Sequence, residues 1–185
     1  MKIRKVITAS ILVTLFIVNG YGQNCKVEFY LLKNIVESID STGMLSNFNV
    51  TKDELEDTAF ITDDEIMSFF VKKYTKDNKI TEEHFFYVPK TVVERINELK
   101  IPLCCGRQFA LLVDREIAYG GYFWNHFSSF GCNGIVAYAY DERISVQRKL
   151  PDYGSEDDKD ELDKRKKPIL FDCLKSTNRM KNDEK

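Results

Sequence analysis

The chain has 185 residues, with 27 basic and 29 acidic side chains and a formal net charge of −2. A slightly acidic chain without a clustered basic face has the composition of a protein that does not bind nucleic acid. Five cysteines and 43% hydrophobic residues are enough for a single domain with a full core that disulfides can tie together.

The first 22 residues have the pattern of a cleaved secretory signal. A basic start at 1–5 precedes an uncharged apolar run at 6–18, and small residues precede a cleavage point after Gly22. The apolar run is shorter than the roughly 20 residues of a membrane-spanning helix. Asn24, directly before Cys25, is unlike the small residue of a bacterial lipid-attachment site. We therefore predict a secreted or periplasmic protein with no membrane span once the signal is removed.

All five cysteines follow the signal, in a compartment where disulfides form. The odd number leaves at least one thiol free or paired between chains. A bond between the adjacent Cys104 and Cys105 would close a very strained ring, so we expect one of them to reach Cys132. Cys25 and Cys173 would then tie the two ends of the domain together, although the sequence does not decide between the connectivities.

The start of the mature chain predicts a strand and a loop. Apolar and polar residues alternate over 26–32, which indicates a strand with one buried face. Helical spacing of apolar residues up to Ile39 leaves a helix open as an alternative, and we expect the strand to lead into a short helix. Residues 40–58 are rich in Asp, Ser, Gly and Asn and predict a loop.

The next segment predicts a β-hairpin. Thr62 and Glu65 have the spacing of a capping box, which begins either a helix or a single turn ahead of a strand. Residues 66–71 are rich in β-forming side chains, 76–79 have the composition of a turn, and 80–88 predict a return strand. These features favour the hairpin over a helix.

The most regular helical pattern covers residues 91–100. Thr91 and Glu94 have the spacing of a second capping box, and Pro102 closes the segment. A helix with one apolar face can pack against a sheet to build a two-layer α+β domain. The apolar face consists of Val92, Val93, Ile96 and Leu99.

The densest apolar stretch of the chain predicts the centre of a sheet. Alternation indicates strands at 109–113 and 116–122, joined by a tight turn at Asp114 and Arg115, and a third strand at 135–140. Together with the hairpin and the first strand, these segments predict an α+β fold. We expect an antiparallel sheet of about five strands packed on the one main helix.

The C-terminal region changes in composition. We predict that a single α+β domain covers 23–150 and that 151–167, where charges of both signs replace apolar residues, is an exposed loop. Residues 168–174 are apolar and are predicted to return to the core as a final strand or packed extension. Residues 175–185 predict a disordered polar tail.

Several short patterns occur in order between residues 58 and 140. They are Phe60 to Ile66, Gly106-x-x-Phe109, Val113-Asp114, Ile117-x-Tyr119-x-Gly121-x-Phe123-Trp124, and Ser128-Ser129. In this order they resemble small secreted or lipid-anchored proteins of Bacteroidota whose function is uncharacterised. The resemblance implies a fold and a compartment, but no reaction and no catalytic residue. The order of the elements is also similar, in architecture alone, to the periplasmic head module of the SecD translocation subunit.

One corner of the predicted sheet is the leading candidate for function. Two glycines permit sharp turns or close approach, and five aromatic side chains occur in a short stretch. An exposed aromatic patch there would bind an unknown protein or another envelope component, whereas buried aromatics would only seal the end of the sheet. We predict a non-catalytic binding domain. The candidate binding residues are Tyr119, Gly121, Tyr122, Phe123, Trp124, His126, Ser128 and Ser129.

The alternative function is a secreted hydrolase that uses Ser128 or Cys132 as nucleophile with His126 as base. The sequence lacks the nucleophile elbow and the orienting acid that such chemistry uses. A zinc site built from Cys104, Cys105, Cys132 and His126 would lack the two-residue spacing of neighbouring ligands. We therefore predict neither a metal nor a cofactor.

Overall fold

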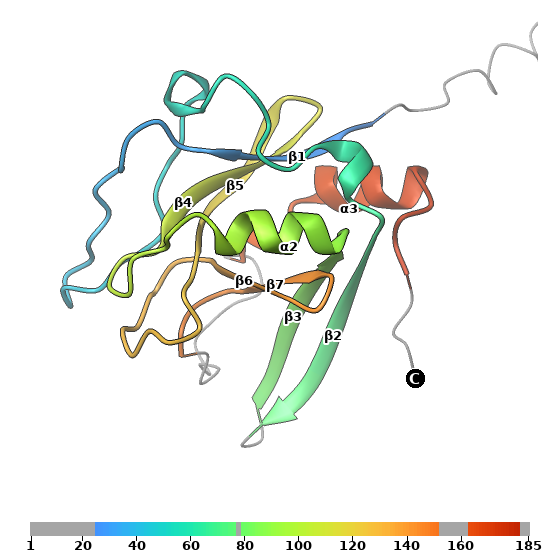
Figure 1. Cartoon of the computed structure of the whole chain (residues 1–185). Coiled ribbons are helices and arrows are strands. Elements are labelled where there is room, and N and C mark those ends of the chain that lie inside the picture. Colours follow the sequence, from blue (N-terminus) through green and yellow to red (C-terminus); the bar gives the residue numbers. More distant parts are fainter. Residues whose placement is uncertain (1–24, 77–78, 152–162, 182–185) are drawn as a thin grey trace, which may run out of the picture.

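The structure is a computed structural model that describes residues 25–76, 79–151 and 163–181. Within these ranges the chain forms one mixed sheet of seven strands and only two short helices (Figure 1). The prediction of five antiparallel strands on one main helix is therefore wrong, and the fold is mostly β. The strands are β1 (Val27–Leu31), β2 (Ser68–Lys76), β3 (Lys79–Tyr87), β4 (Arg107–Val113), β5 (Glu116–Phe123), β6 (Val136–Tyr140) and β7 (Arg143–Gln147), and the helices are α2 (Lys90–Asn97) and α3 (Pro168–Ser176).

The strands lie in the order β1-β4-β5-β6-β7-β3-β2. Every neighbouring pair is antiparallel except β5 and β6, which are parallel. Two parallel strands cannot be joined by a tight turn and need a connection of about a dozen residues. The segment 124–135 supplies that connection. The prediction of a fully antiparallel sheet is wrong at this point. The same connection also contains part of the predicted aromatic corner.

Two hairpin turns have left-handed residues at both central positions. Asp114 and Arg115 have φ angles of 49° and 67°, and Asp141 and Glu142 have φ angles of 45° and 57°. Two consecutive left-handed residues are typical of a type I′ turn, whose twist matches that of the paired strands. The first turn confirms the predicted hairpin. The second joins β6 to β7, a strand that was not predicted.

The two helices cover one face of the sheet. Helix α2 packs over β6 and β7, and α3 packs over β1 and β4 (Figure 1). Alternate residues of β1, β4 and β5, such as Phe29, Phe109 and Phe123, meet the helices in one buried cluster. Burying a side chain of this size contributes about 1.5–3 kcal/mol. The helices contribute Val92, Val93, Ile96, Leu170, Cys173 and Leu174.

The opposite face of β4 and β5 is covered by coil. Phe48 and Leu55 pack there against Leu112 and Tyr122 in a second buried cluster. The predicted short helix after β1 is not formed. Residues 35–38 have no regular secondary structure, and the backbone N–H and C=O of Val36 both bond the side-chain amide of Gln108, each at 2.7 Å.

The helix boundaries differ from those predicted. Helix α2 begins directly after Pro89, so Thr91 lies inside its first turn and does not cap it. The capping box of Thr62 and Glu65 is present, but it closes a single 3-10 turn ahead of β2. The predicted hairpin of β2 and β3 is confirmed. Residues 168–174, predicted as a strand or packed extension, belong to α3.

The C-terminal residues are more ordered than predicted. Most of the predicted charged loop, 152–162, lies outside the described residues, as do the predicted signal and residues 182–185. At the end of that loop, however, Asp163 and Arg165 are buried. Residues 179–181 lie along the edge of β2, where the Phe69 N–H donates to the Arg179 carbonyl at 2.8 Å. The prediction of a disordered tail is therefore wrong for the described part of 175–185.

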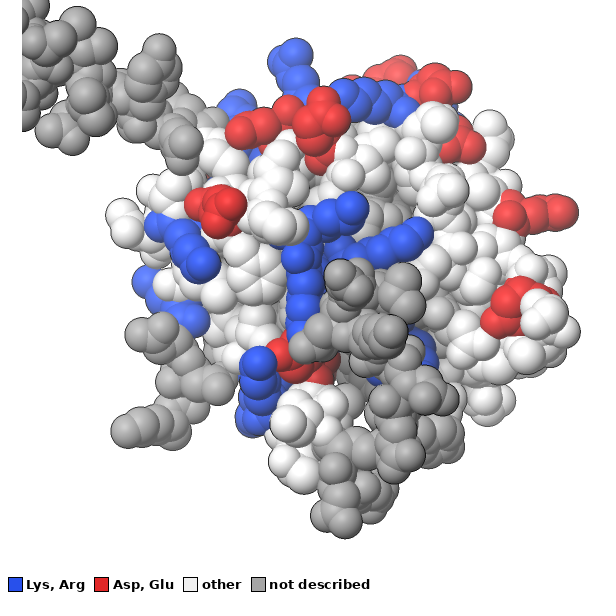
Figure 2. All heavy atoms as spheres, turned by 180° about the vertical axis from the view of Figure 1, so that it is seen from behind, with Lys and Arg blue, Asp and Glu red and all other residues white. Residues whose placement is uncertain are grey.

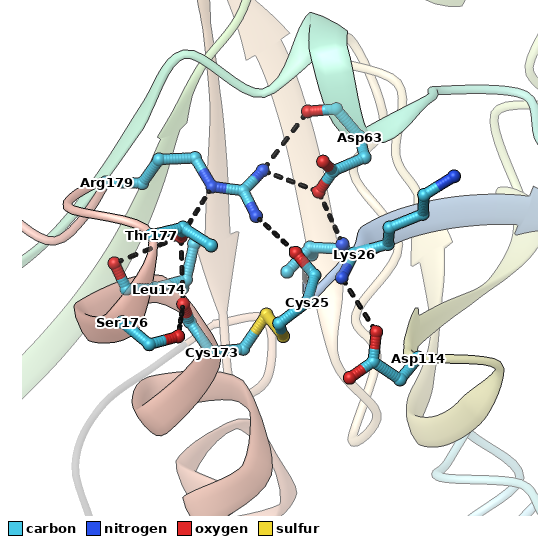
Figure 3. The surroundings of a disulfide bond; sticks show 10 residues. Cys25, Lys26, Asp63, Asp114, Cys173, Leu174, Ser176, Thr177 and Arg179 are labelled. Atoms are coloured by element: carbon cyan, nitrogen blue, oxygen red, sulfur yellow. Dashed lines mark hydrogen bonds and ion pairs between the residues drawn. A yellow bond between two sulfur atoms is a disulfide. The ribbon is translucent and has the colours of Figure 1, made fainter. Parts of the chain in front are cut away.

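A disulfide joins Cys25, ahead of β1, to Cys173 in α3 (Figure 3). Their Cα atoms are 5.6 Å apart, which is within the usual range. This is the predicted tie between the two ends of the domain, and it fits a protein of an extracellular or periplasmic compartment. The predicted bond to Cys132 is absent: Cys104, Cys105 and Cys132 are free.

Cys132 lies in a position that keeps it away from the other free thiols. It forms backbone bridges with Leu45 and Leu150, inside the cluster under the coil, whereas Cys104 and Cys105 precede β4 in an outer loop. Among the described residues, no helix has the length and apolar character needed to cross a membrane.

Candidate binding surface

The predicted aromatic corner divides into a buried half and an exposed half. Tyr119, Tyr122, Phe123 and Trp124 are all at most 2% exposed, so they belong to the core. Gly121 is needed there for packing, because a Cβ atom at this position would lie 2.7 Å from the Phe109 ring. This buried half of the predicted site acts as a scaffold for the exposed half.

Beyond Trp124 the chain leaves the sheet and forms an outer loop. The Asn125 side-chain amide donates to the Ile101 carbonyl at 3.2 Å, and its oxygen accepts from the Phe127 N–H at 2.9 Å. The Ser128 hydroxyl donates to the Leu103 carbonyl. These bonds hold the loop 125–131 against the loop between α2 and β4.

The two loops expose three large apolar side chains. Phe127 is 89% exposed, Phe130 is 55% exposed and Leu103 is 52% exposed. We call these three residues the apolar rim. Single exposed apolar side chains are ordinary on protein surfaces. Here, however, three of them occur on two loops that are bonded to each other, which is a feature of interaction surfaces.

A cleft of about 700 Å³ lies beside the rim. Its walls come from the end of α2, the loop that follows Trp124 and the turn between β6 and β7. The indole N–H of Trp124 is buried and has no hydrogen-bond partner among the described residues. Buried polar groups usually have a partner, so this unpaired donor is an exception within the core. The lining residues include Asn97, Lys100, Trp124, Asn125, His126 and Tyr140.

His126 lies in the wall of the cleft as a packed side chain. Its ring centroid is 5.0 Å from that of Tyr138 and 6.0 Å from that of Tyr140. Its Nε2 atom lies 3.2 Å from the Ala139 carbonyl, and a proton on Nε2 would complete a hydrogen bond. Sequence reasoning identified His126, but it did not identify Tyr138 and Tyr140, which come from the parallel strand.

The geometry does not favour the hydrolase alternative. Cys132 is fully buried, and burial raises the pKa of its thiol to about 11, so the nucleophilic thiolate is disfavoured. The Ser128 hydroxyl is engaged with the Leu103 carbonyl, and Ser129 is an exposed loop residue. Throughout the described ranges, no three His, Cys, Asp or Glu side chains are grouped to hold a metal ion.

A buried ion pair is a feature that sequence reasoning missed. Asp163 and Arg165 have side-chain exposures of 4% and 2%, and their Oδ2 and Nη2 atoms are 2.7 Å apart. Burial alone would raise the pKa of Asp163, but the hydrogen bonds and charge of Arg165 lower it. Arg165 Nη1 also donates to the carbonyls of Glu82 and Val146, each at 2.9 Å. The pair therefore fastens the C-terminal region to β3 and β7.

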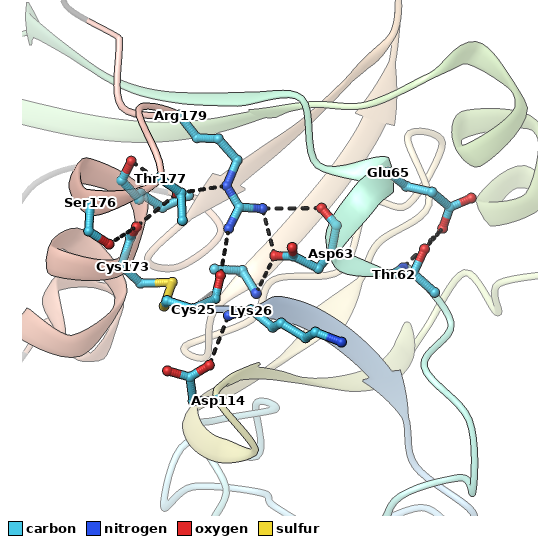
Figure 4. Close-up of polar contacts among 12 residues, drawn as sticks. Cys25, Lys26, Thr62, Asp63, Glu65, Asp114, Cys173, Ser176, Thr177 and Arg179 are labelled. Atoms are coloured by element: carbon cyan, nitrogen blue, oxygen red, sulfur yellow. Dashed lines mark hydrogen bonds and ion pairs between the residues drawn. A yellow bond between two sulfur atoms is a disulfide. The ribbon is translucent and has the colours of Figure 1, made fainter. Parts of the chain in front are cut away.

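A second polar cluster surrounds the disulfide. Arg179 donates to the carbonyls of Cys25 and Asp63, to the Asp63 carboxylate and to the Thr177 hydroxyl (Figure 4). The same carboxylate accepts from the Val27 N–H at 2.7 Å. This cluster joins the beginning of β1, the turn before β2 and the end of α3. Its polar groups bond one another, so we assign it a structural role.

The charges on the face opposite to that of Figure 1 are mixed in sign. Figure 2 shows a column of Lys and Arg side chains, with Asp and Glu gathered mainly near the upper edge and at isolated positions. No protein-family model matches the chain, and no curated protein matches it. The resemblance to secreted Bacteroidota proteins and to the SecD head module therefore stays a prediction.

Proposed function

We propose that this chain is a secreted or periplasmic, non-catalytic binding domain that recognises a protein partner through the apolar rim. The observation that carries the proposal is the exposure of Phe127, Phe130 and Leu103 on two loops that are hydrogen-bonded to each other. Exposed aromatic side chains on a firm support are typical centres of binding energy at protein interfaces. An export signal cleaved near Gly22 would deliver the domain to the compartment in which its disulfide forms.

The fixed loop that carries the rim favours binding of a specific partner over non-specific adhesion. Trp124, directly before the loop, is buried. The side-chain nitrogen and the side-chain oxygen of Asn125 each form a hydrogen bond that holds the loop in place. An ordered loop loses little conformational freedom on binding, so more of the contact energy becomes affinity. The cleft of about 700 Å³ beside the rim gives a side chain of the partner a hollow to enter.

The proposal can be tested with a photoreactive amino acid. We would replace Phe127 with benzoylphenylalanine in the exported protein, irradiate the producing cells and look for a cross-linked adduct. The matched control carries the same amino acid at Ile80, which is 73% exposed near the tip of the β2–β3 hairpin (Figure 1). Position 127 should give a discrete protein adduct that position 80 does not give.

A second variant pair separates binding from stability. Phe130→Ser should reduce the adduct formed at position 127 by about tenfold or more, in keeping with loss of an interface anchor. Met67→Ser, which also removes a half-exposed apolar side chain, should leave the adduct unchanged. Equal adduct yields at positions 80 and 127, or no adduct at position 127, would refute recognition through the rim.

A further inference from the structure

The loop between α2 and β4 carries two adjacent free thiols. The Sγ atoms of Cys104 and Cys105 are 3.2 Å apart. Cys104 is exposed and Cys105 is half-buried, so reagents in solution can reach the pair. The remaining free thiol, Cys132, is fully buried and bonded to the backbone of Gly134. The two adjacent thiols are therefore the accessible pair among the described cysteines.

The loop holds these thiols in place from both sides. Gly106 has a φ of +63°, and a Cβ atom there would lie 2.8 Å from the Phe123 carbonyl oxygen and 2.9 Å from the Trp124 ring. The Leu103 carbonyl accepts from the Ser128 hydroxyl. Residues on both sides of the pair are therefore anchored, and the two sulfurs lie next to each other in an exposed and a half-buried side chain.

The same chain already contains a disulfide, between Cys25 and Cys173. A compartment that forms this bond contains disulfide oxidants, and these reach Cys104 as well. Joining Cys104 to Cys105 requires the sulfurs to move from 3.2 Å to about 2.05 Å. The Cα atoms of adjacent residues are only about 3.8 Å apart, less than the usual spacing across a disulfide. The resulting bond is strained, and strained disulfides are the ones that are easily reduced again.

We propose that Cys104 and Cys105 form a redox modification site, a vicinal dithiol that closes reversibly to a disulfide by exchange with an external disulfide. The Cys104 thiolate attacks one sulfur of the oxidant, breaks its S–S bond and releases one thiolate. The Cys105 thiolate then attacks Cys104 Sγ, breaks the mixed disulfide and releases the second thiolate. Two protein thiols are oxidised, one external disulfide is reduced to two thiols, and the protein's two protons pass to water or to the released thiolates.

This proposal does not rest on the proposed binding function, although Cys104 directly follows Leu103 of the apolar rim. The ring strain that makes a permanent Cys104–Cys105 bond unfavourable is what makes the modification reversible. Burial, followed by the neighbouring Cys104, raises the pKa of the Cys105 thiol, so the exposed Cys104 is the thiol that reacts first. A mixed disulfide at Cys104 then brings a leaving group next to the waiting Cys105.

The test uses the mature protein with its Cys25–Cys173 bond intact. The protein is incubated with oxidised glutathione, its native thiols are blocked with N-ethylmaleimide, and intact mass and peptide maps are recorded. In the absence of oxidant we expect both Cys104 and Cys105 to be labelled. After oxidation we expect neither thiol to be labelled and no glutathione to be bound, so the intact mass should lie about 2 Da below that of the reduced, unlabelled protein, because closing the ring removes two hydrogens.

Two variants make the test decisive. Cys105→Ser removes the resolving thiol and should accumulate a stable glutathione adduct on Cys104. Cys132→Ala should behave like the wild type, since that thiol is buried. A persistent glutathione adduct on the wild-type protein, or full labelling of both thiols after every oxidant concentration, would overturn the proposal. Circular dichroism checks that each variant is folded.

Discussion

His84 is a fully buried histidine, and neither of its ring nitrogens has a partner among the described residues. Its ring lies edge-on to those of Phe69 and Phe171, with centroids 5.5 Å and 5.9 Å away. Burial, and then the charge of Arg165, lower the pKa of His84 to about 3. The side chain is therefore neutral in the folded protein, whereas unfolding restores a pKa near its ordinary value of about 6.5.

This difference makes stability depend on pH. Between about pH 6.5 and pH 3 the unfolded chain binds a proton at His84 that the folded chain does not bind. The stability that the neutral His84 side chain contributes is therefore fully present above about pH 6.5, its pKa in the unfolded chain, and is lost as the pH falls toward about 3. We expect a slope of up to about 1.4 kcal/mol per pH unit. His84→Phe should remove that slope, as measured by urea unfolding between about pH 7 and pH 5.

The other histidine provides the matched control. His126 is exposed at the cleft, and the slope measured for His126→Gln shows what the loss of a histidine at the surface does. The pKa of Glu65 is lowered, so this carboxylate titrates below its ordinary range. Restricting the comparison to values above about pH 5 separates the histidine from the carboxylates. Equal slopes for the wild type and His84→Phe would show that His84 is not held in its neutral form.

At the scale of elements, the parts predicted correctly are those with local signals. The Asp114-Arg115 turn lies between two alternating strands, and a two-residue turn fixes an antiparallel pairing by itself. The β2–β3 hairpin and most of α2 were predictable for the same reason. The Cys25–Cys173 bond could be proposed, because it closes the domain, but the sequence did not exclude the other pairings.

The parts that failed depend on contacts between distant residues. Ile144 and Val146 alternate in β7, but the strand is only five residues long and becomes a strand by pairing with both β3 and β6. Residues 168–174 are apolar and short, and periodicity alone does not separate a buried strand from a buried helix. Their helical state follows from Leu170, Cys173 and Leu174, which all face the core.

The predicted binding corner combines core residues with surface residues, which the sequence did not separate. The aromatic density around Tyr122 is a core signal, because β5 is covered on both faces. Phe127 and Phe130 are exposed because the crossover to a parallel strand carries them away from the sheet. That crossover is set by the strand order, which local sequence patterns do not encode.

The buried pair of Asp163 and Arg165 leads to a prediction about the C-terminal segment. Arg165→Met should destabilise the protein by about 3–5 kcal/mol, because it leaves the Asp163 carboxylate buried without its partner. The double variant Asp163→Leu/Arg165→Met should be more stable than this single variant, since no unpaired charge remains. Urea unfolding of both variants and the wild type measures the difference.

A surface pair serves as the reference for this comparison. Lys90→Met breaks the exposed ion pair with Glu94, which should change stability by less than about 1 kcal/mol. A single Arg165→Met variant that is as stable as the double variant would argue against a buried charge at Asp163. It would then follow that packing alone holds this segment to β3 and β7.

At the scale of the whole molecule, coil segments bond part of each edge strand of the sheet. Along β1, the Phe29 N–H donates to the Ile61 carbonyl at 2.9 Å. Along β2, Phe69 bonds the backbone of Arg179 and of Lys181, at 2.8 Å and 2.7 Å. An open strand edge is a template for pairing with another chain. The C-terminal residues, predicted as a disordered tail, therefore have a protective position.

This protective position leads to a prediction for two truncated proteins. Ending the chain after Thr177 removes the backbone bonds to β2 and the contacts of Arg179 with Asp63 and Cys25, so we expect a loss of about 2–4 kcal/mol. The uncovered β2 edge should also promote association that grows with protein concentration. Ending the chain after Lys181 keeps all these contacts and should leave stability and monomer content unchanged. Urea unfolding and sedimentation velocity compare the two proteins, and the idea of a protective C-terminus fails if they behave alike.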